Sequence, residues 1–240
     1  MDDNYVHYNK LGITDALELR LVEYDLTTRR GREILNENAL GHPGSYDLKH
    51  LQAIHQHLFQ DVYAWAGKPR TIPLAKMLDK GTVSVFANPE DIEPKWRELA
   101  QKTHAFATAG GLTFKQKVDA LVDIFVDANH IHPFPEGNGR SLQVFMCQLA
   151  REQGVALDYG KTNDREWNRA SAVSGVHGEV VEDGPGDKRL KQYPRDRGLI
   201  AGVFENMARP ERISEQAAGV VNRTLDLIRR VAAATRHAKR

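Results

Sequence analysis

The sequence predicts a mainly α-helical domain with one β-hairpin and a helical extension at its C-terminal end. Apolar residues recur at every third or fourth position through much of the chain, which is the spacing of one buried helix face. One segment instead holds two short β-prone runs around a polar turn that contains glycine, a pattern typical of a hairpin. The 240 residues, 41% of them hydrophobic and 27% charged, suit one globular domain with a sizeable core.

Helical spacing appears in five segments, and several residues near their ends are typical of helix boundaries. Asp15 and Asp47 suit N-cap positions, because a carboxylate can accept hydrogen bonds from the unpaired amides of a first turn. Pro89 suits a first helical turn, and Gly154 suits a helix end. The five segments are residues 17–26, 48–58, 92–99, 118–126 and 142–149.

The β-prone runs are residues 70–76 and 82–87, and they predict a hairpin at about 71–86. Pro73 has no amide N–H to donate, so its strand is expected at the edge of a sheet. Residues 174–198 are rich in Gly, Asp, Lys and Pro, and this composition predicts a loop.

The chain is expected to leave the main domain near Pro210. The sequence therefore divides into a domain at 1–208 and a tail at 209–240. Residues 211–240 carry apolar side chains at helical spacing, with seven Lys or Arg and three Asp or Glu. A basic helix face of this kind is most often simply solvated.

Composition excludes several classes of protein. A net charge of +1 indicates neither a nucleic-acid partner nor a membrane surface, and the sequence has no run of 18 apolar residues to span a bilayer. The single cysteine, Cys147, excludes an internal disulfide and a CxxC zinc site. The first ten residues lack the apolar core of a signal peptide. A cytoplasmic protein is expected, although an effector translocated into a host cell has the same composition.

The histidine pairs do not indicate a zinc site. His130 and His132 are two positions apart and do not share a helix face. His55 and His57 also face in different directions and are expected at the surface.

The stretch His132-Pro-Phe-Pro-Glu-Gly-Asn-Gly-Arg140 joins two helical segments and gathers several chemical groups. Glycines let backbone amides turn toward a ligand, and the start of a helix favours an anion. Arg140 can donate two hydrogen bonds to phosphate oxygens. Glu136 provides one carboxylate, which suits Mg²⁺ because this ion takes few protein ligands. The stretch predicts phosphoryl or nucleotidyl transfer.

His132 is the imidazole of this stretch, and its ordinary pKa lets it accept a hydroxyl proton near neutral pH. Phe134 is expected to point inward and anchor the loop. A Gly-Asn-Gly turn between helices can also be a plain connector, and a histidine there can be a capping residue. The combination of base, carboxylate, glycine turn and arginine favours the functional interpretation.

The same stretch resembles the core motif of the Fic (Fic/Doc) family, in the branch that transfers AMP from ATP to protein hydroxyls. Further resemblances lie at Asn9–Thr14, Leu58–Arg70, Phe86–Pro89 and Asp164–Ala170, so the likeness covers roughly residues 5–205. It implies a Fic-type helical bundle with a β-hairpin flap at about 71–86 over the active site.

The resemblance also implies a role for each residue of the motif. His132 would be the catalytic base, and Glu136 would hold Mg²⁺ bound to the α- and β-phosphates of ATP. Gly137, Asn138 and Gly139 would form the anion hole, and Arg140 would contact the phosphates that leave. The target protein would dock by adding a strand to the flap, so that its Tyr, Thr or Ser hydroxyl attacks the α-phosphorus and releases pyrophosphate.

Gln143 departs from the family pattern, because the motif usually carries a second arginine at this position. In the family that arginine binds the γ-phosphate and pairs with an inhibitory glutamate. The sequence also lacks the usual Ser/Thr-x-x-x-Glu-Gly/Asn inhibitory motif, since the segments at Thr14–Leu19 and Thr162–Trp167 end differently. We therefore expect no built-in inhibitory helix of the usual type. Inhibition by a small antitoxin supplied in trans stays an alternative.

Gln143 keeps two alternatives open. The first is other Fic chemistry: a different nucleotide donor, phosphorylation or removal of AMP. The second is a weakly active Fic-fold regulator that acts by protein binding. The complete Gly-Asn-Gly-Arg140 run argues against the kinase branch, which usually departs from it.

Overall fold

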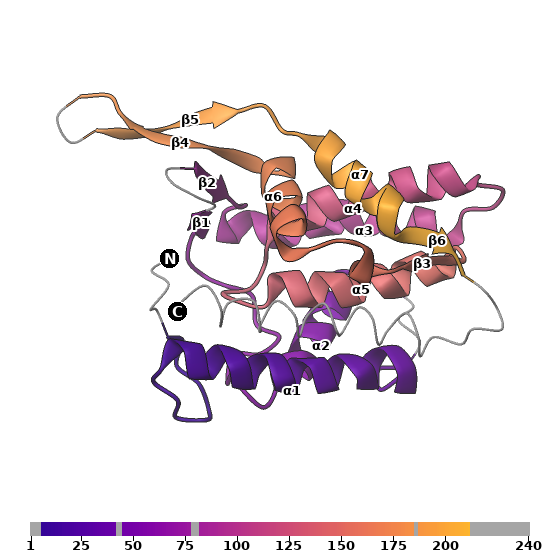
Figure 1. Cartoon of the computed structure of the whole chain (residues 1–240), viewed down its shortest axis with the longest axis horizontal. Coiled ribbons are helices and arrows are strands. Elements are labelled where there is room, and N and C mark those ends of the chain that lie inside the picture. Colours follow the sequence, from indigo (N-terminus) through magenta and orange to yellow (C-terminus); the bar gives the residue numbers. More distant parts are fainter. Residues whose placement is uncertain (1–5, 42–44, 78–81, 185–186, 212–240) are drawn as a thin grey trace.

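The computed structural model describes residues 6–41, 45–77, 82–184 and 187–211, and most of the described chain is helical (Figure 1). Its α-helices are α1 (Ala16–Glu37), α2 (Leu48–Phe59), α3 (Ile92–Thr108), α4 (Phe114–Ile131), α5 (Asn138–Glu152), α6 (Asp164–Ser174) and α7 (Arg197–Met207). Short 3₁₀ turns lie at Pro89–Asp91 and Tyr159–Lys161. The strands are β1 (Ala75–Met77), β2 (Thr82–Val85), β3 (Val155–Leu157), β4 (Val176–Glu182), β5 (Lys188–Tyr193) and β6 (Ala208–Pro210).

The predicted helix boundaries are confirmed where the side chains cap them. Asp15 accepts a hydrogen bond from the Glu18 amide, and Asp47 accepts one from the His50 amide. Pro89 opens the 3₁₀ turn that leads into α3. These caps satisfy amides that have no partner inside their helix, so local sequence sets where α1 and α2 begin.

Helix α5 forms the centre of the core and packs against α1, α2, α3 and α4. Its stripe Leu142–Ala150 is buried on nearly every side. Phe145 is fully buried and meets the rings of Tyr46, His50 and Trp96 edge-on. Burial also raises the pKa of Cys147 to about 11, as expected for a packed, unreactive thiol. The core therefore fixes the helix whose first turn carries the predicted anion site.

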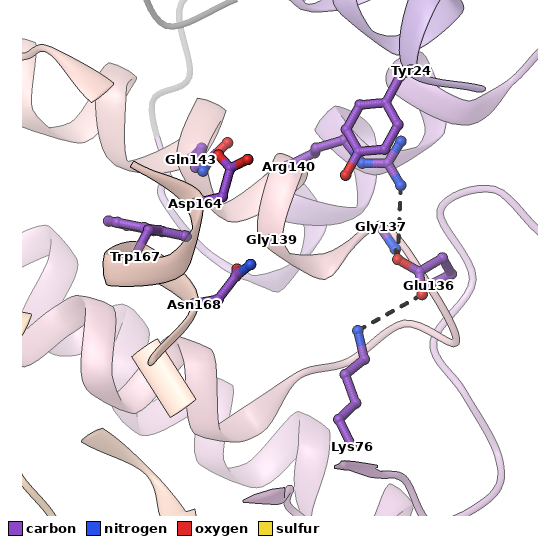
Figure 2. A pocket seen from close by; sticks show the side chains of 10 residues that line it. All are labelled: Tyr24, Lys76, Glu136, Gly137, Gly139, Arg140, Gln143, Asp164, Trp167 and Asn168. Atoms are coloured by element: carbon purple, nitrogen blue, oxygen red, sulfur yellow. Dashed lines mark hydrogen bonds and ion pairs between the residues drawn. The ribbon is translucent and has the colours of Figure 1, made fainter. Parts of the chain in front are cut away.

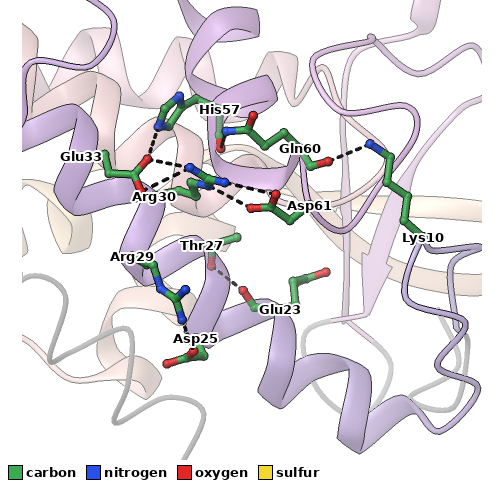
Figure 3. A network of polar contacts seen from close by, with 10 residues as sticks. All are labelled: Lys10, Glu23, Asp25, Thr27, Arg29, Arg30, Glu33, His57, Gln60 and Asp61. Carbon is green, nitrogen blue, oxygen red and sulfur yellow. Dashed lines mark hydrogen bonds and ion pairs between the residues drawn. The ribbon is translucent and has the colours of Figure 1, made fainter.

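A polar network holds α1 against α2 and the segment that follows it (Figure 3). Arg30 donates to Asp61 at 2.8 Å and to Glu33 at 2.9 Å, and the His57 ring lies 2.8 Å from the same Glu33 carboxylate. The hydrogen bond from Arg30 lowers the pKa of Glu33. Partly exposed ion pairs contribute only about 0.2–1 kcal/mol each. Their main effect is on the placement of α1, which carries residues of the site.

The predicted hairpin is confirmed as β1 and β2, which pair antiparallel from Ala75–Val85 to Met77–Val83. Its turn, residues 78–81, lies outside the described residues. The four-stranded sheet has the order β1-β2-β4-β5, so β1 is an edge strand. Pro73 lies just before β1, which agrees with the predicted edge position.

The loop predicted for residues 174–198 is wrong. This segment holds β4 and β5, and β4 continues the sheet of the flap by pairing Val176–Glu179 with β2. Beyond residue 179, β4 and β5 pair only with each other and project from the body (Figure 1). Side chains there are exposed or half-buried, and none is fully buried, so the strands lack the alternation of apolar and polar residues that marks a half-buried strand.

Gly178 provides a test of this second hairpin. A Cβ at this position would lie 2.1 Å from the carbonyl oxygen of Lys191 on β5, so the two backbones would have to separate. We expect Gly178→Ala to destabilise the protein by about 1–3 kcal/mol and to speed amide hydrogen exchange in β4 and β5.

Gly202→Ala is the matched control for Gly178→Ala. Gly202 lies in α7 with no atom within 4 Å of an added Cβ, and alanine favours a helix by up to about 1 kcal/mol. An equal melting temperature for Gly178→Ala and wild type would contradict the close approach of the strands.

The last described residues still belong to the domain. Strand β6 pairs with β3, from Val155–Pro210 to Leu157–Ala208. The start of the predicted tail therefore contributes a strand to the domain, whereas the helix predicted at 211–240 lies outside the described residues except for Glu211. None of the described helices is long and apolar enough to cross a membrane.

Candidate active site

A cavity of about 210 Å³ lies at the N-terminal end of α5, where α1, β1, α6 and the loop 132–140 meet (Figure 2). Four of the six predicted site residues line it: Glu136, Gly137, Gly139 and Arg140. His132 and Asn138 are in the same loop but are not part of the lining. The other lining residues are Tyr24, Lys76, Gln143, Asp164, Trp167 and Asn168.

His132 caps the C-terminal end of α4 in a left-handed conformation, with φ of 49°. Its Nδ1 lies 3.2 Å from the Asn129 carbonyl oxygen, so Nδ1 carries the proton and donates it. Its Nε2 is buried and has no hydrogen-bond partner in the described part of the chain. Burial lowers the pKa of His132 well below 6.5, and the Lys76 charge adds to this. The ring is therefore neutral at pH 7 and keeps a free lone pair on Nε2.

Two side chains fix the position of His132. The Phe86 ring, at the exit of the hairpin, stacks on the imidazole with 3.7 Å between ring centroids. Arg70 donates from Nε to the His132 carbonyl oxygen at 2.9 Å and from its other nitrogens to the carbonyls of Ile72 and Ala87. The guanidinium of Arg70 thus ties both ends of the flap to the loop 132–140. Sequence reasoning assigned Arg70 no role, because nothing local marks an arginine whose partners are carbonyls.

Glu136 is the one carboxylate of the loop, and cations surround it. Its Oε1 accepts the Gly137 amide at 2.9 Å, Lys76 Nζ lies 3.7 Å from Oε2, and Arg140 Nη2 lies 3.7 Å from Oε1. Burial favours the protonated form, but Lys76, Arg140, the Gly137 amide and His132 together outweigh it and lower the pKa of Glu136 to about 2. The group is an anion at neutral pH.

The surroundings of Glu136 fit Mg²⁺ shared with a nucleotide, not a cage made by the protein alone. No cluster of three or more His, Cys, Asp or Glu side chains occurs in the described residues. Mg²⁺ is often bound by one or two carboxylates together with phosphates and waters. The ammonium of Lys76 already lies on the side of Glu136 that faces the cavity (Figure 2), so this carboxylate attracts a cation there.

His55 is buried, so its predicted surface position is wrong. Its Nδ1 accepts the Gly67 amide at 2.9 Å, which leaves Nε2 to donate to the Glu136 carbonyl oxygen at 2.9 Å. Burial lowers its pKa to about 4, so the neutral ring makes both bonds. The ring lies between Phe59 and Phe134. His55 thereby supports the loop from behind, a role that spacing within α2 does not indicate.

Asn138 closes the loop with its side chain. Its Oδ1 accepts the Phe134 amide at 2.8 Å, and its Nδ2 donates to the Phe134 carbonyl at 2.7 Å. Phe134 is completely buried, which confirms its predicted inward orientation. The oxygen and the nitrogen of the asparagine amide thus each make a hydrogen bond that holds the turn.

The two glycines of the turn serve different purposes. Gly137 is the N-cap of α5 with φ of +80°, and a Cβ there would lie 2.3 Å from Cζ of Phe59. An added Cβ at Gly139 would meet no atom within 4 Å, so this glycine leaves the cavity open. The first turn of α5 adds unpaired amides and a partial positive charge, which favour a phosphate at this end of the cavity.

Arg140 is held by α1 and by two aromatic rings. Its Nη2 donates to Glu23 Oε1 at 2.5 Å, and its guanidinium carbon lies 4.6 Å from the ring centroid of Tyr24 and 4.7 Å from that of Phe59. Burial opposes the charge, but the Glu23 carboxylate, with smaller effects of Tyr24 and Glu136, raises the pKa of Arg140 above its ordinary value. Sequence reasoning gave Glu23 no role.

The wall beyond Arg140 carries no positive charge. Gln143 lies one helical turn further along α5, and Asp164, Trp167 and Asn168 come from α6 (Figure 2). Asp164 Oδ1 is buried without a hydrogen-bond partner among the described residues, and burial raises the pKa of this carboxyl. The described cations that line the cavity are Arg140 and Lys76.

Comparison with known proteins finds relatives that are named adenylyltransferases. Residues 45–150 match the Fic/DOC family. The chain is 36% identical over 170 residues to protein adenylyltransferase VbhT of Bartonella schoenbuchensis, and the match covers 70% of this chain and 34% of that protein. It is 34% identical over 167 residues to the probable protein adenylyltransferase y4lH of Sinorhizobium fredii, covering 68% of this chain and 80% of that protein. The chain thus spans about a third of the first relative.

Solved structures agree on the fold. BepC, a VirB-translocated effector of Bartonella tribocorum with bound AMPPNP, matches with a TM-score of 0.71 and 22% identity, over 88% of this chain and 99% of that one. The N-terminal Fic domain of a Bep effector of Bartonella quintana, with bound ADP, matches with a TM-score of 0.70 and 23% identity, over 88% of this chain and 94% of that one.

Proposed function

This chain belongs to the Fic/DOC family, and on that premise we propose that it is a protein adenylyltransferase. It would move AMP from ATP to a Tyr, Thr or Ser hydroxyl of a target protein and release pyrophosphate. The observation that carries the proposal is the unpartnered Nε2 of a neutral His132, in the loop that also supplies Glu136 and Arg140 to the cavity. The adenylyltransferase names of the relatives and the nucleotides in the solved structures support it.

The residues of the loop divide the work of the reaction. The phosphates of ATP lie over the first turn of α5, and Arg140 contacts those that leave. His132 Nε2 takes the proton of the target hydroxyl as its oxygen forms a bond to the α-phosphorus. The bond from the α-phosphorus to its bridging oxygen breaks, and the electron pair leaves with pyrophosphate. Glu136 would hold Mg²⁺, which would neutralise charge on the phosphates. Fixed donors and charges of this kind lower the barrier because they need no rearrangement.

The target is proposed to dock on β1. This edge strand of the four-stranded sheet has one side free for pairing within the described residues, and an extended segment can add a strand to such an edge. Lys76 on β1 lines the cavity, so a segment paired there would pass beside Glu136 and the phosphates. This arrangement would present a side-chain hydroxyl to the loop.

A change of donor is the second candidate, and the wall formed by Gln143 and Asp164 favours it. A neutral amide and a carboxyl group suit the γ-phosphate of ATP less well than an arginine would. A nucleotide with a less charged group beyond its α-phosphate would suit this wall better.

A small antitoxin supplied in trans would meet Gln143 instead of its usual charged partner. A neighbouring reading frame that encodes Ser/Thr-x-x-x-Glu-Gly would reveal such an antitoxin.

Labelled nucleotides separate the candidates. Purified protein is incubated with a lysate and with ATP labelled at either the α- or the γ-phosphate. AMP transfer places the α label on protein, whereas phosphorylation places the γ label there. Absence of label from ATP and from every other nucleotide labelled in the same way, together with stable binding to a protein partner, would favour the regulator over the enzyme.

Restoring the second arginine provides a quantitative test. We expect Gln143→Arg to raise ATP-dependent transfer about tenfold to a hundredfold, because a charge-assisted contact is worth roughly 1.5–3 kcal/mol. The measurement is the initial rate of α-label transfer at subsaturating ATP.

Gln143→Met is the matched control, because it keeps the size of the side chain without adding charge. It should leave the rate within a few-fold of wild type. Unchanged or lower activity in Gln143→Arg would count against a γ-phosphate role for this position, and would favour a donor other than ATP.

A further inference from the structure

We infer that Glu23 is a positioning residue for Arg140, and that its carboxylate sets the direction in which the guanidinium meets the phosphates. This inference rests on the proposed function, because it assigns Arg140 to the leaving phosphates. Glu23 lies in the middle of α1, 117 positions before Arg140 in the sequence, and only 5% of its surface is exposed.

The contacts of Glu23 leave it little freedom. Oε1 accepts from Arg140 Nη2 at 2.5 Å, and Oε2 accepts from the hydroxyl of Tyr63. Thr27, one turn further along α1, accepts from Arg140 Nη1 at 3.3 Å. Both carboxylate oxygens are therefore engaged, and the two terminal nitrogens of Arg140 each have a partner on α1. These contacts fix the plane of the guanidinium.

The aromatic rings complete a slot around this group. Tyr24 and Phe59 lie within 4.7 Å of the guanidinium carbon, and only 10% of the Arg140 side chain is exposed. A cation so far removed from water needs a fixed counter-charge. Tyr24 and Arg140 both line the cavity (Figure 2), so the slot opens toward the space in which the nucleotide is proposed to bind.

Glu136 cannot replace Glu23 in this role. It lies 3.7 Å from Arg140, beyond hydrogen-bond distance, and it is the carboxylate proposed to hold Mg²⁺. A metal on Glu136 weakens its attraction for Arg140, because the charge of the carboxylate is then shared. Glu23 lies on α1 and is not among the residues that line the cavity, so it keeps Arg140 in place when metal and nucleotide bind.

The opposite role would be inhibitory: Glu23 would pair with Arg140 and compete with phosphate for its guanidinium. The two roles differ in sign. A positioning carboxylate makes nucleotide binding weaker when it is removed, whereas a competing carboxylate makes binding tighter. Removal of a purely structural carboxylate lowers the stability of the protein and weakens nucleotide binding whether or not Arg140 is present.

A double-mutant cycle tests the inference. Glu23→Gln keeps the shape of the side chain and removes its charge, and Arg140→Gln removes the guanidinium. The dissociation constant of AMPPNP with Mg²⁺ is measured by titration calorimetry for the wild type, each single variant and the double variant. We expect Glu23→Gln to weaken binding about tenfold or more in the wild-type background and less than twofold in the Arg140→Gln background. Coupling of this size indicates that Glu23 acts through Arg140.

Two further variants keep the result interpretable. Asp25→Asn removes another carboxylate of α1, which is exposed and pairs with the exposed Arg29, and it should leave AMPPNP binding unchanged. Glu23→Asp keeps the charge but shortens the side chain by one methylene group, so we expect a smaller loss of AMPPNP binding. It serves as the test variant if Glu23→Gln does not fold. Tighter binding in either Glu23 variant, or an equal loss in both backgrounds, would overturn the inference.

The binding measurement also separates this inference from the proposed function. Coupled loss of AMPPNP binding in a protein that transfers no α label would leave the inference standing and contradict the adenylyltransferase. Normal transfer of the α label without coupling between Glu23 and Arg140 would contradict the inference and leave the adenylyltransferase standing.

Discussion

Replacement of His132 by alanine is expected to reduce transfer of the α-phosphate label about 10²- to 10⁴-fold, the range of a lost general base. The neutral imidazole with its unpartnered Nε2 carries this prediction. AMPPNP binding should change little, because His132 is not part of the cavity lining. A loss of nucleotide binding equal to the loss of rate would contradict the assignment of His132 as base.

The pH dependence follows from the same geometry. A base acts in its neutral form, and burial lowers the pKa of His132 well below 6.5. The acidic limb of kcat/KM is therefore expected below pH 6.5, and the rate should be flat just above it. Because the folded state favours the neutral ring, His132 contributes stability above its unfolded pKa of about 6.5, and this stability is lost as the pH falls toward the folded pKa. His104→Ala, at an exposed position on α3, is the control for both measurements.

Replacement of Gly137 by alanine is expected to destabilise the protein by about 2–5 kcal/mol and to abolish detectable transfer. Two causes add. A left-handed backbone costs an L-residue roughly 1–2 kcal/mol, and overpacking costs about 1–3 kcal/mol. The added Cβ would lie 2.3 Å from Cζ of Phe59, and this ring also flanks the guanidinium of Arg140. The clash would therefore disturb both the turn and the phosphate-binding side chain.

Gly139→Ala separates strain from occupancy of the cavity. An added Cβ there meets no atom within 4 Å, and Gly139 lies in the helix α5. We expect an unchanged or slightly higher melting temperature but weaker binding of AMPPNP, because the methyl group enters the space of the phosphates. Equal melting temperatures for Gly137→Ala and Gly139→Ala would contradict the close approach of Phe59.

The loop 132–140 and its two flanking helices were predictable because their signals are local. Apolar spacing marks α4 and α5, and caps such as Asp47 mark helix starts. The residues that support the loop gave no such signal. His55 and Arg70 bond to backbone carbonyls 81 and 62 positions away, and a single polar residue does not show in its own segment that it is buried.

The hairpin formed by β4 and β5 is a second case in which local sequence did not predict the structure. Its residues are polar and rich in glycine, which is typical of a loop. They form strands because β4 pairs with β2 of the flap and β5 pairs with β4. Hydrogen bonds between backbones do not require an apolar pattern, so the partner strand decided this structure and the composition did not.

The sequence by itself determined the family, the helical class and the group of residues that could carry the chemistry, because these depend on motif and spacing. Only the tertiary structure decided which atoms are free to act. It placed Nδ1 of His132 against a carbonyl oxygen, left Nε2 buried without a partner among the described residues, and held Arg140 against Glu23 of α1. The physical reason is that a proton position, a pKa or the direction of a guanidinium depends on groups that only folding brings within a few ångströms.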